Sequence, residues 1–232
     1  MASKIEVKNI TKTYKDIHAL DDISIDLDLG KITGVLGPNG SGKTSLLKAL
    51  AGLIRLDSGQ IEIDGKKIKA IDKNKIAYLA DEKFLFDYQS IAEIGKMYEE
   101  FFPGFNKEYF EQIINFFHLN PKNKIANLSK GDYKKLGLCL NLSRDASIYI
   151  FDEPIDGLDS IAAAKVIDLV IDKVSQGKTF VISTHQISNI ENLFDDVIFL
   201  KNGKLHEFGQ AKAIRDEYGM DLCDFYDEIY LG

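Results

Sequence analysis

Short apolar runs alternate with longer segments of helical spacing along this chain, as in α/β proteins with a largely parallel sheet. Four of the runs consist mostly of β-branched and aromatic residues, which is typical of strands covered on both faces. They lie at residues 32–36, 147–151, 179–183 and 197–200. The pattern therefore predicts a buried, mostly parallel sheet.

A different pattern marks the N-terminal part of the chain. Residues 23–29 (ISIDLDL) alternate between apolar and polar positions, which predicts an antiparallel strand with one face in solvent. Residues 5–7 and 61–63 follow the same pattern. A smaller antiparallel sheet is therefore expected to flank the parallel one.

Aromatic residues are concentrated between positions 84 and 118, where 11 of the chain's 24 Phe and Tyr side chains fall. The helical spacing of residues 90–102 and 107–117 predicts a helical subdomain inserted in the α/β core, at about residues 84–142. Most of these rings would form its core. A subdomain of this size cannot bury all eleven rings. We therefore expect part of its surface to be aromatic and exposed, and to bind a partner.

The charge balance excludes one class of function. The 232 residues include 29 basic and 36 acidic side chains, which gives a formal net charge of −7, and only three of the basic residues are arginine. Such a chain lacks the basic surface that binds nucleic acid. Cys139 and Cys223 form no CxxC motif, so neither a disulfide framework nor a zinc site is expected. No apolar run approaches the ~18 residues of a membrane span, which predicts a soluble, cytoplasmic chain.

The strongest local motif is GPNGSGKT at residues 37–44, between the apolar run at 32–36 and a helical pattern. Glycines let the backbone curl so that successive N–H groups face phosphate oxygens, and the positive end of the helix dipole faces the same anion. A lysine then reaches the β- and γ-phosphates, and a hydroxyl binds Mg²⁺. The predicted nucleotide-binding residues here are Gly37, Pro38, Asn39, Gly40, Ser41, Gly42, Lys43, Thr44 and Ser45.

Two carboxylates follow the apolar run at 147–151, where ligands bind in open α/β sheets. Asp152 is placed to orient Mg²⁺, and Glu153 is placed to polarise an attacking water. His185 ends the next apolar run in the same way and is placed to reach a γ-phosphate. The motifs together predict a nucleoside triphosphatase.

With these motifs in this order, the chain resembles the ATP-binding cassette ATPases, the nucleotide-binding subunits of ABC transporters. The resemblance runs from about residue 3 to about residue 210. It implies one ABC ATPase domain over residues 1–232, with the P-loop NTPase (RecA-like) α/β fold. The last segment, residues 210–232, is then a short tail. For its acidic and aromatic end, residues 223–232, the sequence leaves a fraying helix and a dimer contact as alternatives.

The resemblance also implies residue roles. Tyr14 takes the place of the aromatic residue that stacks on adenine, and residues 37–44 and 148–153 match the Walker A and Walker B motifs with Glu153 as the catalytic glutamate. Residues 154–159 resemble the D-loop, in which Asp159 faces the partner subunit. His185 matches the switch histidine.

Two motifs depart from the family pattern. The signature Leu-Ser-Gly-Gly-Gln is LSKGD here, so that Ser129, Lys130 and Gly131 are the residues expected to contact the ATP of the partner subunit. In the Q-loop, Asp81 replaces the glutamine that touches Mg²⁺ and the attacking water. Aspartate still binds Mg²⁺, so we expect Asp81 to be a metal ligand together with Thr44 and Asp152.

The implied function is ATP hydrolysis coupled to transport, with ATP and Mg²⁺ bound. Two such subunits, identical or different, close around two ATP molecules and move transmembrane permease subunits, at the inner face of the cell membrane. The overall layout most resembles the compact cassettes of bacterial drug, bacteriocin and peptide exporters, and this resemblance favours export over import. The alternatives are a soluble single-cassette ABC ATPase and a weakly hydrolysing regulatory clamp, while the cargo is not encoded in this chain.

Overall fold

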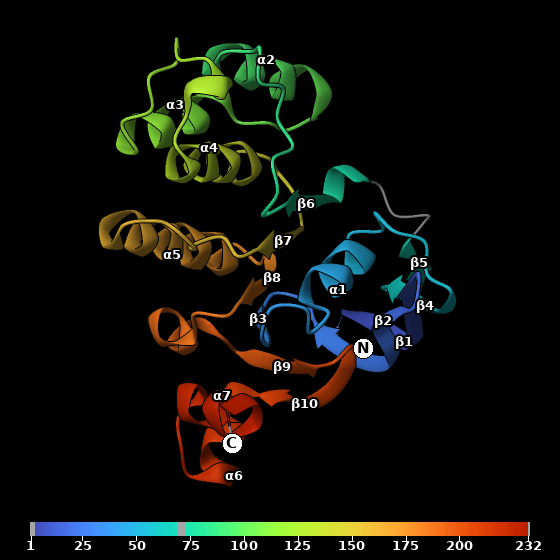
Figure 1. The fold of residues 1–232 in the computed structure, drawn as a ribbon. Helices are drawn as coiled ribbons and strands as arrows, with labels where there is room; N and C mark the ends of the chain where they lie inside the picture. Colours follow the sequence, from blue (N-terminus) through green and yellow to red (C-terminus); the bar gives the residue numbers. More distant parts are fainter. Residues whose placement is uncertain (1–2, 69–72, 232) are drawn as a thin grey trace.

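The structure, a computed structural model, describes residues 3–68 and 73–231. Its centre is a six-stranded sheet with the strand order β10-β9-β3-β8-β7-β6 (Figure 1). The strands are β3 (Ile32–Leu36), β6 (Ile76–Leu79), β7 (Ile148–Asp152), β8 (Thr179–Thr184), β9 (Asp196–Lys201) and β10 (Lys204–Gln210). Neighbours pair in parallel, except that β10 is antiparallel to β9. The four predicted strands are confirmed, whereas the pattern did not predict β6 and β10.

Strand β7 shows why its sequence is continuously apolar. All its residues are buried, and successive side chains of a strand point to opposite faces of the sheet. Ile148 and Ile150 therefore pack into the core on one face. Tyr149 and Phe151 pack into the core on the other face, where the Tyr149 ring stacks on Phe180. One run of residues thus serves two cores.

The predicted antiparallel sheet is also confirmed, with the strand order β2-β1-β4-β5. Its strands are β1 (Lys4–Tyr14), β2 (Ile17–Asp28), β4 (Ser58–Ile63) and β5 (Lys66–Lys67). Apolar side chains from this sheet, from helix α1 (Lys43–Leu50) and from one face of the six-stranded sheet share a single core. Helix α1 is thereby held between the two sheets (Figure 1).

Three helices form a group beyond the β6 edge of the large sheet, and we call α2 (Ile91–Phe101), α3 (Lys107–Phe116) and α4 (Lys130–Leu142) the helical group (Figure 1). Helix α2 begins where predicted because Ser90 and Glu93 form a capping box. The aromatic side chains divide as expected between a core and a surface. Buried rings include Tyr98, Phe110 and Phe117, while Phe84, Phe86, Tyr88, Phe101 and Phe116 are exposed.

The C-terminal tail forms two packed helices rather than a frayed end. Helices α6 (Ala211–Tyr218) and α7 (Leu222–Leu231) follow β10, and α7 buries Leu222, Phe225 and Ile229. The Tyr230 hydroxyl donates a hydrogen bond to the Leu200 carbonyl oxygen at 2.7 Å, which ties α7 to β9.

Helix α5 (Ser160–Ser175) packs its buried side into the same core as the helical group. The short 3₁₀ turns are η2 (Lys73–Lys75), η3 (Ile125–Asn127), η4 (Ile187–Asn189) and η5 (Glu191–Leu193). Over the ranges that the structure describes, every helix is too short or too polar to traverse a bilayer.

Candidate active site

The loop between β3 and α1 depends on glycine at its tightest point. Gly42 has a φ of 111°, and a Cβ atom there would lie 2.5 Å from the carbonyl oxygen of Ala19. Gly42 also precedes the first turn of α1, whose N–H groups no side chain caps. Uncapped N–H groups at the positive end of a helix attract anions, so the turn is suited to phosphate.

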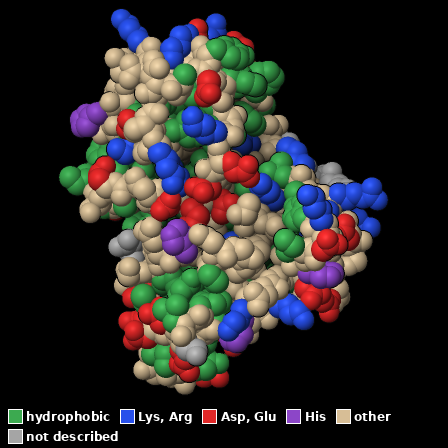
Figure 2. Space-filling view, viewed as in Figure 1, with side chains coloured by type: hydrophobic (Ala, Val, Ile, Leu, Met, Phe, Trp, Pro, Cys, Tyr) green, Lys and Arg blue, Asp and Glu red, His purple; other side chains and the backbone are tan. Residues whose placement is uncertain are grey.

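A cavity of about 350 Å³ lies over this turn, at the carboxyl ends of β3 and β7. Its lining residues are Ile17, Ala19, Asn39, Gly40, Gly42, Lys43, Thr44, Ser45, Asp81, Asp152 and Glu153. Predicted P-loop, Walker B and Q-loop residues are thus brought together. In Figure 2, acidic and basic side chains lie side by side in the middle of this face, between the helical group and the sheets.

The Lys43 ammonium is held inside the loop that precedes it. It donates hydrogen bonds to the carbonyl oxygens of Gly37 at 2.7 Å and Pro38 at 3.2 Å, and the side chain is 6% exposed. Its Nζ atom is also 3.6 Å from Glu153 Oε1. The buried Ser41 hydroxyl, in the same loop, has no hydrogen-bond partner among the described residues. The loop therefore presents a fixed cation and an unsatisfied polar atom.

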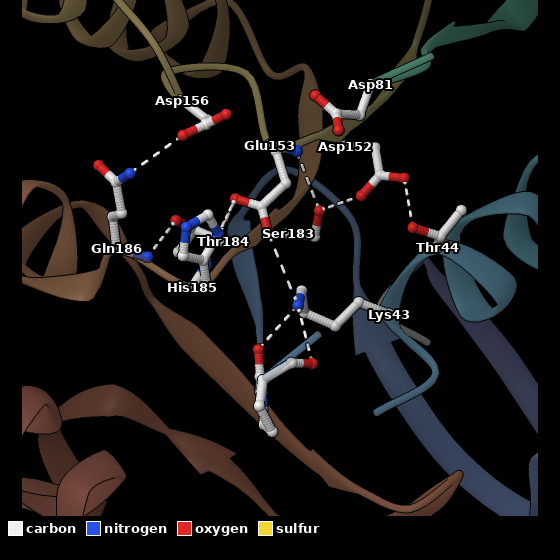
Figure 3. A network of polar contacts seen from close by, with 12 residues as sticks. Lys43, Thr44, Asp81, Asp152, Glu153, Asp156, Ser183, Thr184, His185 and Gln186 are labelled. Carbon is white, nitrogen blue, oxygen red and sulfur yellow. Dashed lines mark hydrogen bonds and ion pairs between the residues drawn. The ribbon is translucent and has the colours of Figure 1, made fainter. Parts of the chain in front are cut away.

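Asp152 is fixed by two hydroxyl groups (Figure 3). Its Oδ2 accepts a hydrogen bond from Thr44 Oγ1 at 2.7 Å, and its Oδ1 accepts one from Ser183 Oγ. Ser183 lies opposite Asp152 in the parallel register of β7 and β8, and it also accepts a hydrogen bond from the Glu153 N–H at 3.0 Å. Ser183 was not predicted as a site residue, although its place two residues before His185 on a buried strand points to this edge.

Glu153 and His185 form a direct pair (Figure 3). The ring atom Nδ1 of His185 is 3.0 Å from Glu153 Oε2, and the backbone N–H of His185 donates to the same oxygen at 3.3 Å. Glu153 is 8% exposed, and its backbone adopts a φ of 49°. The side chain of the adjacent Gln186 donates to Asp156 Oδ1 at 3.0 Å, which links the end of β8 to the loop after β7.

The charge of Glu153 also affects Tyr226 on α7. Burial is the main cause that raises the pKa of the Tyr226 hydroxyl, and the negative charge of Glu153 is the second.

Asp81 lines the cavity but is paired with a lysine. Its Oδ1 accepts a hydrogen bond from Lys134 Nζ at 2.8 Å. Lys134, which the sequence analysis did not single out, also donates to the carbonyl oxygen of Glu153 at 2.7 Å. The role of Asp81 as a metal ligand stays a prediction.

Ser129, Lys130 and Gly131 lie at the start of α4, and they do not line the cavity. The Ser129 Oγ accepts a hydrogen bond from the Asp132 N–H at 3.1 Å and donates one to the Asp132 carboxylate at 2.8 Å. Aspartate at this position thus completes a helix cap. The exposed Lys130 ammonium is 3.3 Å from the Asp156 carboxylate.

Asp159 and Tyr14 also lie outside the cavity lining. Asp159 caps α5 by accepting a hydrogen bond from the Ala162 N–H at 2.8 Å, which, with Lys135, lowers the pKa of this carboxyl below its usual range. Tyr14 ends β1 and pairs with Ile17, which lines the cavity and is 71% exposed. The adenine contact therefore stays a prediction, and Ile17 is an apolar neighbour that the sequence analysis missed.

Comparison with known proteins identifies the family. A family model described as "ABC transporter" matches residues 20–156. The ABC transporter ATP-binding protein MJ1023 of Methanocaldococcus jannaschii is 35% identical, over 92% of this chain and 80% of its own length. The chain belongs to the ABC transporter family.

Further relatives agree with this assignment. The peptide export protein SkfE of Bacillus subtilis is 31% identical, over 87% of each chain, and the lantibiotic transport protein SrtF of Streptococcus pyogenes is 28% identical, over 87% of this chain and 88% of its own. A solved ATP-binding subunit of an ABC transporter superposes with a TM-score of 0.87 at 24% identity, covering 97% of this chain and 98% of that one, which supports the fold. This ABC transporter subunit binds ATP and is an ATPase.

The donor set around Thr44 fits the magnesium ion that accompanies ATP in this family. The Thr44 hydroxyl and the Asp152 carboxylate are in contact, and both are hard oxygen ligands. Among the described residues, His, Cys, Asp and Glu side chains do not gather in threes around any one point. Two protein oxygens suffice for Mg²⁺, however, because the ion keeps several waters and takes further ligands from phosphates.

Proposed function

We propose that this ABC transporter subunit hydrolyses ATP in the P-loop cavity, with Glu153 polarising the attacking water and His185 contacting the γ-phosphate. One observation carries the proposal. Lys43 and His185 approach the two oxygens of the Glu153 carboxylate, at 3.6 Å and 3.0 Å, at the wall of that cavity. A fixed carboxylate beside a phosphate-binding loop is what general-base assistance requires. The presence of both Glu153 and His185 at this place favours a hydrolysing subunit over the regulatory clamp.

The other residues predicted for the nucleotide site have proposed roles in binding. The loop at residues 37–42, Lys43 and the first turn of α1 through Ser45 hold the phosphates, and Tyr14 stacks on adenine. Thr44, Asp152 and Asp81 are the residues we assign to Mg²⁺, which when bound would offset the charge of the phosphate oxygens. In this proposal the chain acts as one ABC ATPase domain, with residues 84–142 as its helical subdomain and 210–232 as its tail.

A second ABC ATPase subunit completes each site. Ser129, Lys130 and Gly131 are proposed to contact the ATP of that subunit, and Asp159 is proposed to lie at the same interface. Two features support this: these residues do not line the cavity of their own chain, and the Lys130 side chain is 75% exposed. An exposed cation at the start of a helix is suited to a phosphate that arrives from outside.

The proposed partner in transport is a transmembrane permease, which the two ATPase subunits would move when they close around ATP. This permease would hold the subunit at the inner face of the cell membrane. The exposed rings of Phe84, Phe86 and Tyr88, next to the Q-loop segment, support a docking surface there, because large exposed apolar patches mark interfaces. Export is favoured over import, since two relatives, SkfE and SrtF, are named for peptide export and lantibiotic transport.

The test uses tagged Glu153→Gln, which should bind Mg-ATP but hydrolyse it at least a hundredfold more slowly than the wild type. Purification from solubilised native membranes, with and without ATP, should recover a polytopic membrane protein. Phe86→Ala/Tyr88→Ala should lose that protein while binding nucleotide normally, and Phe101→Ala, another exposed ring of the helical group, is the matched control. Recovery of soluble proteins alone would refute the proposed permease partner, and unchanged hydrolysis in Glu153→Gln would refute the proposed catalytic role of Glu153.

A further inference from the structure

One lysine connects the helical group to the catalytic loop. Lys134, one turn into α4, is 6% exposed. Its Nζ atom lies 2.8 Å from Asp81 Oδ1, 2.7 Å from the Glu153 carbonyl oxygen and 3.9 Å from Asp156 Oδ2. Lysine is almost never buried without such partners. These three oxygens belong to the segment after β6 and to the loop after β7, so a single ammonium joins three parts of the chain.

The Glu153 carbonyl is a sensitive place for such a contact. Glu153 has a φ of 49°, in the left-handed region that residues with side chains seldom occupy. A backbone in that region persists only where its surroundings hold it. Here the N–H of Glu153 donates to Ser183 Oγ at 3.0 Å and to the Ser183 carbonyl oxygen at 3.2 Å. Its C=O accepts from Lys134 at 2.7 Å and, at the longer distance of 3.3 Å, from the Asp156 N–H. Both ends of the residue are therefore held.

The direction of the Glu153 side chain follows from that backbone. With the residue held in this conformation, its two carboxylate oxygens face Lys43 and His185 (Figure 3). Loss of the Lys134 hydrogen bond would remove the shorter of the two contacts on the Glu153 carbonyl oxygen and its only charged donor, and leave the Asp156 N–H at 3.3 Å. The strained residue, and with it the direction of the carboxylate, would then be held less firmly. A small displacement of a catalytic group lowers the rate of the chemical step strongly, without affecting substrate contacts made elsewhere.

Asp81 explains how the Lys134 ammonium can stay charged in a buried position. A buried ammonium with only a carbonyl partner is costly, whereas a charged partner at 2.8 Å offsets much of its desolvation. Conversely, Lys134 neutralises the Asp81 carboxylate at the wall of a cavity that we assign to phosphates. Each charge of the pair therefore stabilises the other.

We infer that Lys134 is a positioning residue for ATP hydrolysis, which holds the Glu153 backbone through its carbonyl oxygen while Asp81 balances its charge. The inference rests on the proposed role of Glu153. Lys134 touches neither nucleotide nor water in this assignment and does not line the P-loop cavity.

The test compares steady-state kinetics of the full chain. Lys134→Met keeps an unbranched side chain, one atom shorter, and removes its charge, and it should lower kcat about tenfold or more while KM for ATP stays within about threefold. Lys178→Met is the matched control. Lys178 pairs with Asp145 at 2.6 Å and precedes β8, at the opposite end of that strand from His185, so its kcat should stay at the wild-type value.

A second pair of variants separates positioning from folding. Asp81→Asn/Lys134→Met leaves no unpaired charge, so its thermal midpoint should exceed that of Lys134→Met. If Lys134 acts through the Glu153 carbonyl, kcat of this double variant stays about tenfold below that of Asp81→Asn alone. Equal kcat for the double variant and Asp81→Asn would overturn the inference, as would a Lys134→Met variant with kcat within twofold of the wild type.

Glu153→Gln, measured alongside, distinguishes the two ways to fail. An unchanged rate in Glu153→Gln refutes the proposed catalytic role, and the inference with it. An inactive Glu153→Gln together with a fully active Lys134→Met refutes the inference alone.

Discussion

Replacement of Gly42 by alanine tests the origin of the P-loop conformation. At this residue φ is 111°, and the added Cβ would lie 2.5 Å from the Ala19 carbonyl oxygen, which belongs to β2 and cannot rotate away as a side chain can. Left-handed backbone costs about 1–2 kcal/mol for a residue with a Cβ. Forced overpacking against the backbone adds about 1–3 kcal/mol. The expected loss in the free energy of unfolding for Gly42→Ala is therefore about 2–5 kcal/mol.

The matched control is Gly30→Ala. Gly30 has a φ of 79°, and an added Cβ there has nothing within 4 Å. This variant should carry only the backbone cost of about 1–2 kcal/mol. Both variants are measured by urea unfolding without nucleotide at neutral pH, with m-values compared to confirm that the same transition is observed. Equal losses in the two variants would refute the argument, because the contact with Ala19 would then contribute nothing.

Three further outcomes are expected. Ser183→Ala should lower the free energy of unfolding by about 1–3 kcal/mol and reduce kcat, because Asp152 and the Glu153 N–H each lose a buried partner; denaturant unfolding and steady-state kinetics measure this. Tyr230→Phe should lower that free energy by about 1 kcal/mol through loss of the bond to Leu200, and a Tm equal to wild type would contradict it. The hydrogen bond from the Ser90 N–H lowers the pKa of Glu93 from 4.5 to about 2, so the stabilisation by this carboxylate is complete above about pH 4.5 and is lost as pH falls toward 2. The difference in Tm between wild type and Glu93→Gln should shrink over that interval.

The local parts of the site could be predicted from the sequence. The loop at residues 37–44 was identified because an apolar strand, closely spaced glycines and a helical pattern are all properties of adjacent residues. The carboxylates Asp152 and Glu153 were identified for the same reason, since they end a strand that is apolar throughout.

The contacts between strands were not predictable in this way. Ser183 meets Asp152 because β7 and β8 pair in parallel register, across a crossover that contains α5. Hydrophobic periodicity identifies strands but does not state which residues of two distant strands lie opposite each other. Strand β10, whose residues alternate in burial at the edge of the sheet, was missed because half-exposed edge strands carry a weak apolar signal.

The sequence by itself therefore determined the four strands buried on both faces, the phosphate-binding loop and the two carboxylates, because each arises from residues that are neighbours along the chain. Only the tertiary structure decided how the carboxylates are held. Lys134 reaches Asp81 and the Glu153 carbonyl from a helix 53 and 19 residues away. These contacts depend on how α4 packs beside the end of β6. That packing results from the shared burial of apolar side chains of both elements and not from any local sequence pattern.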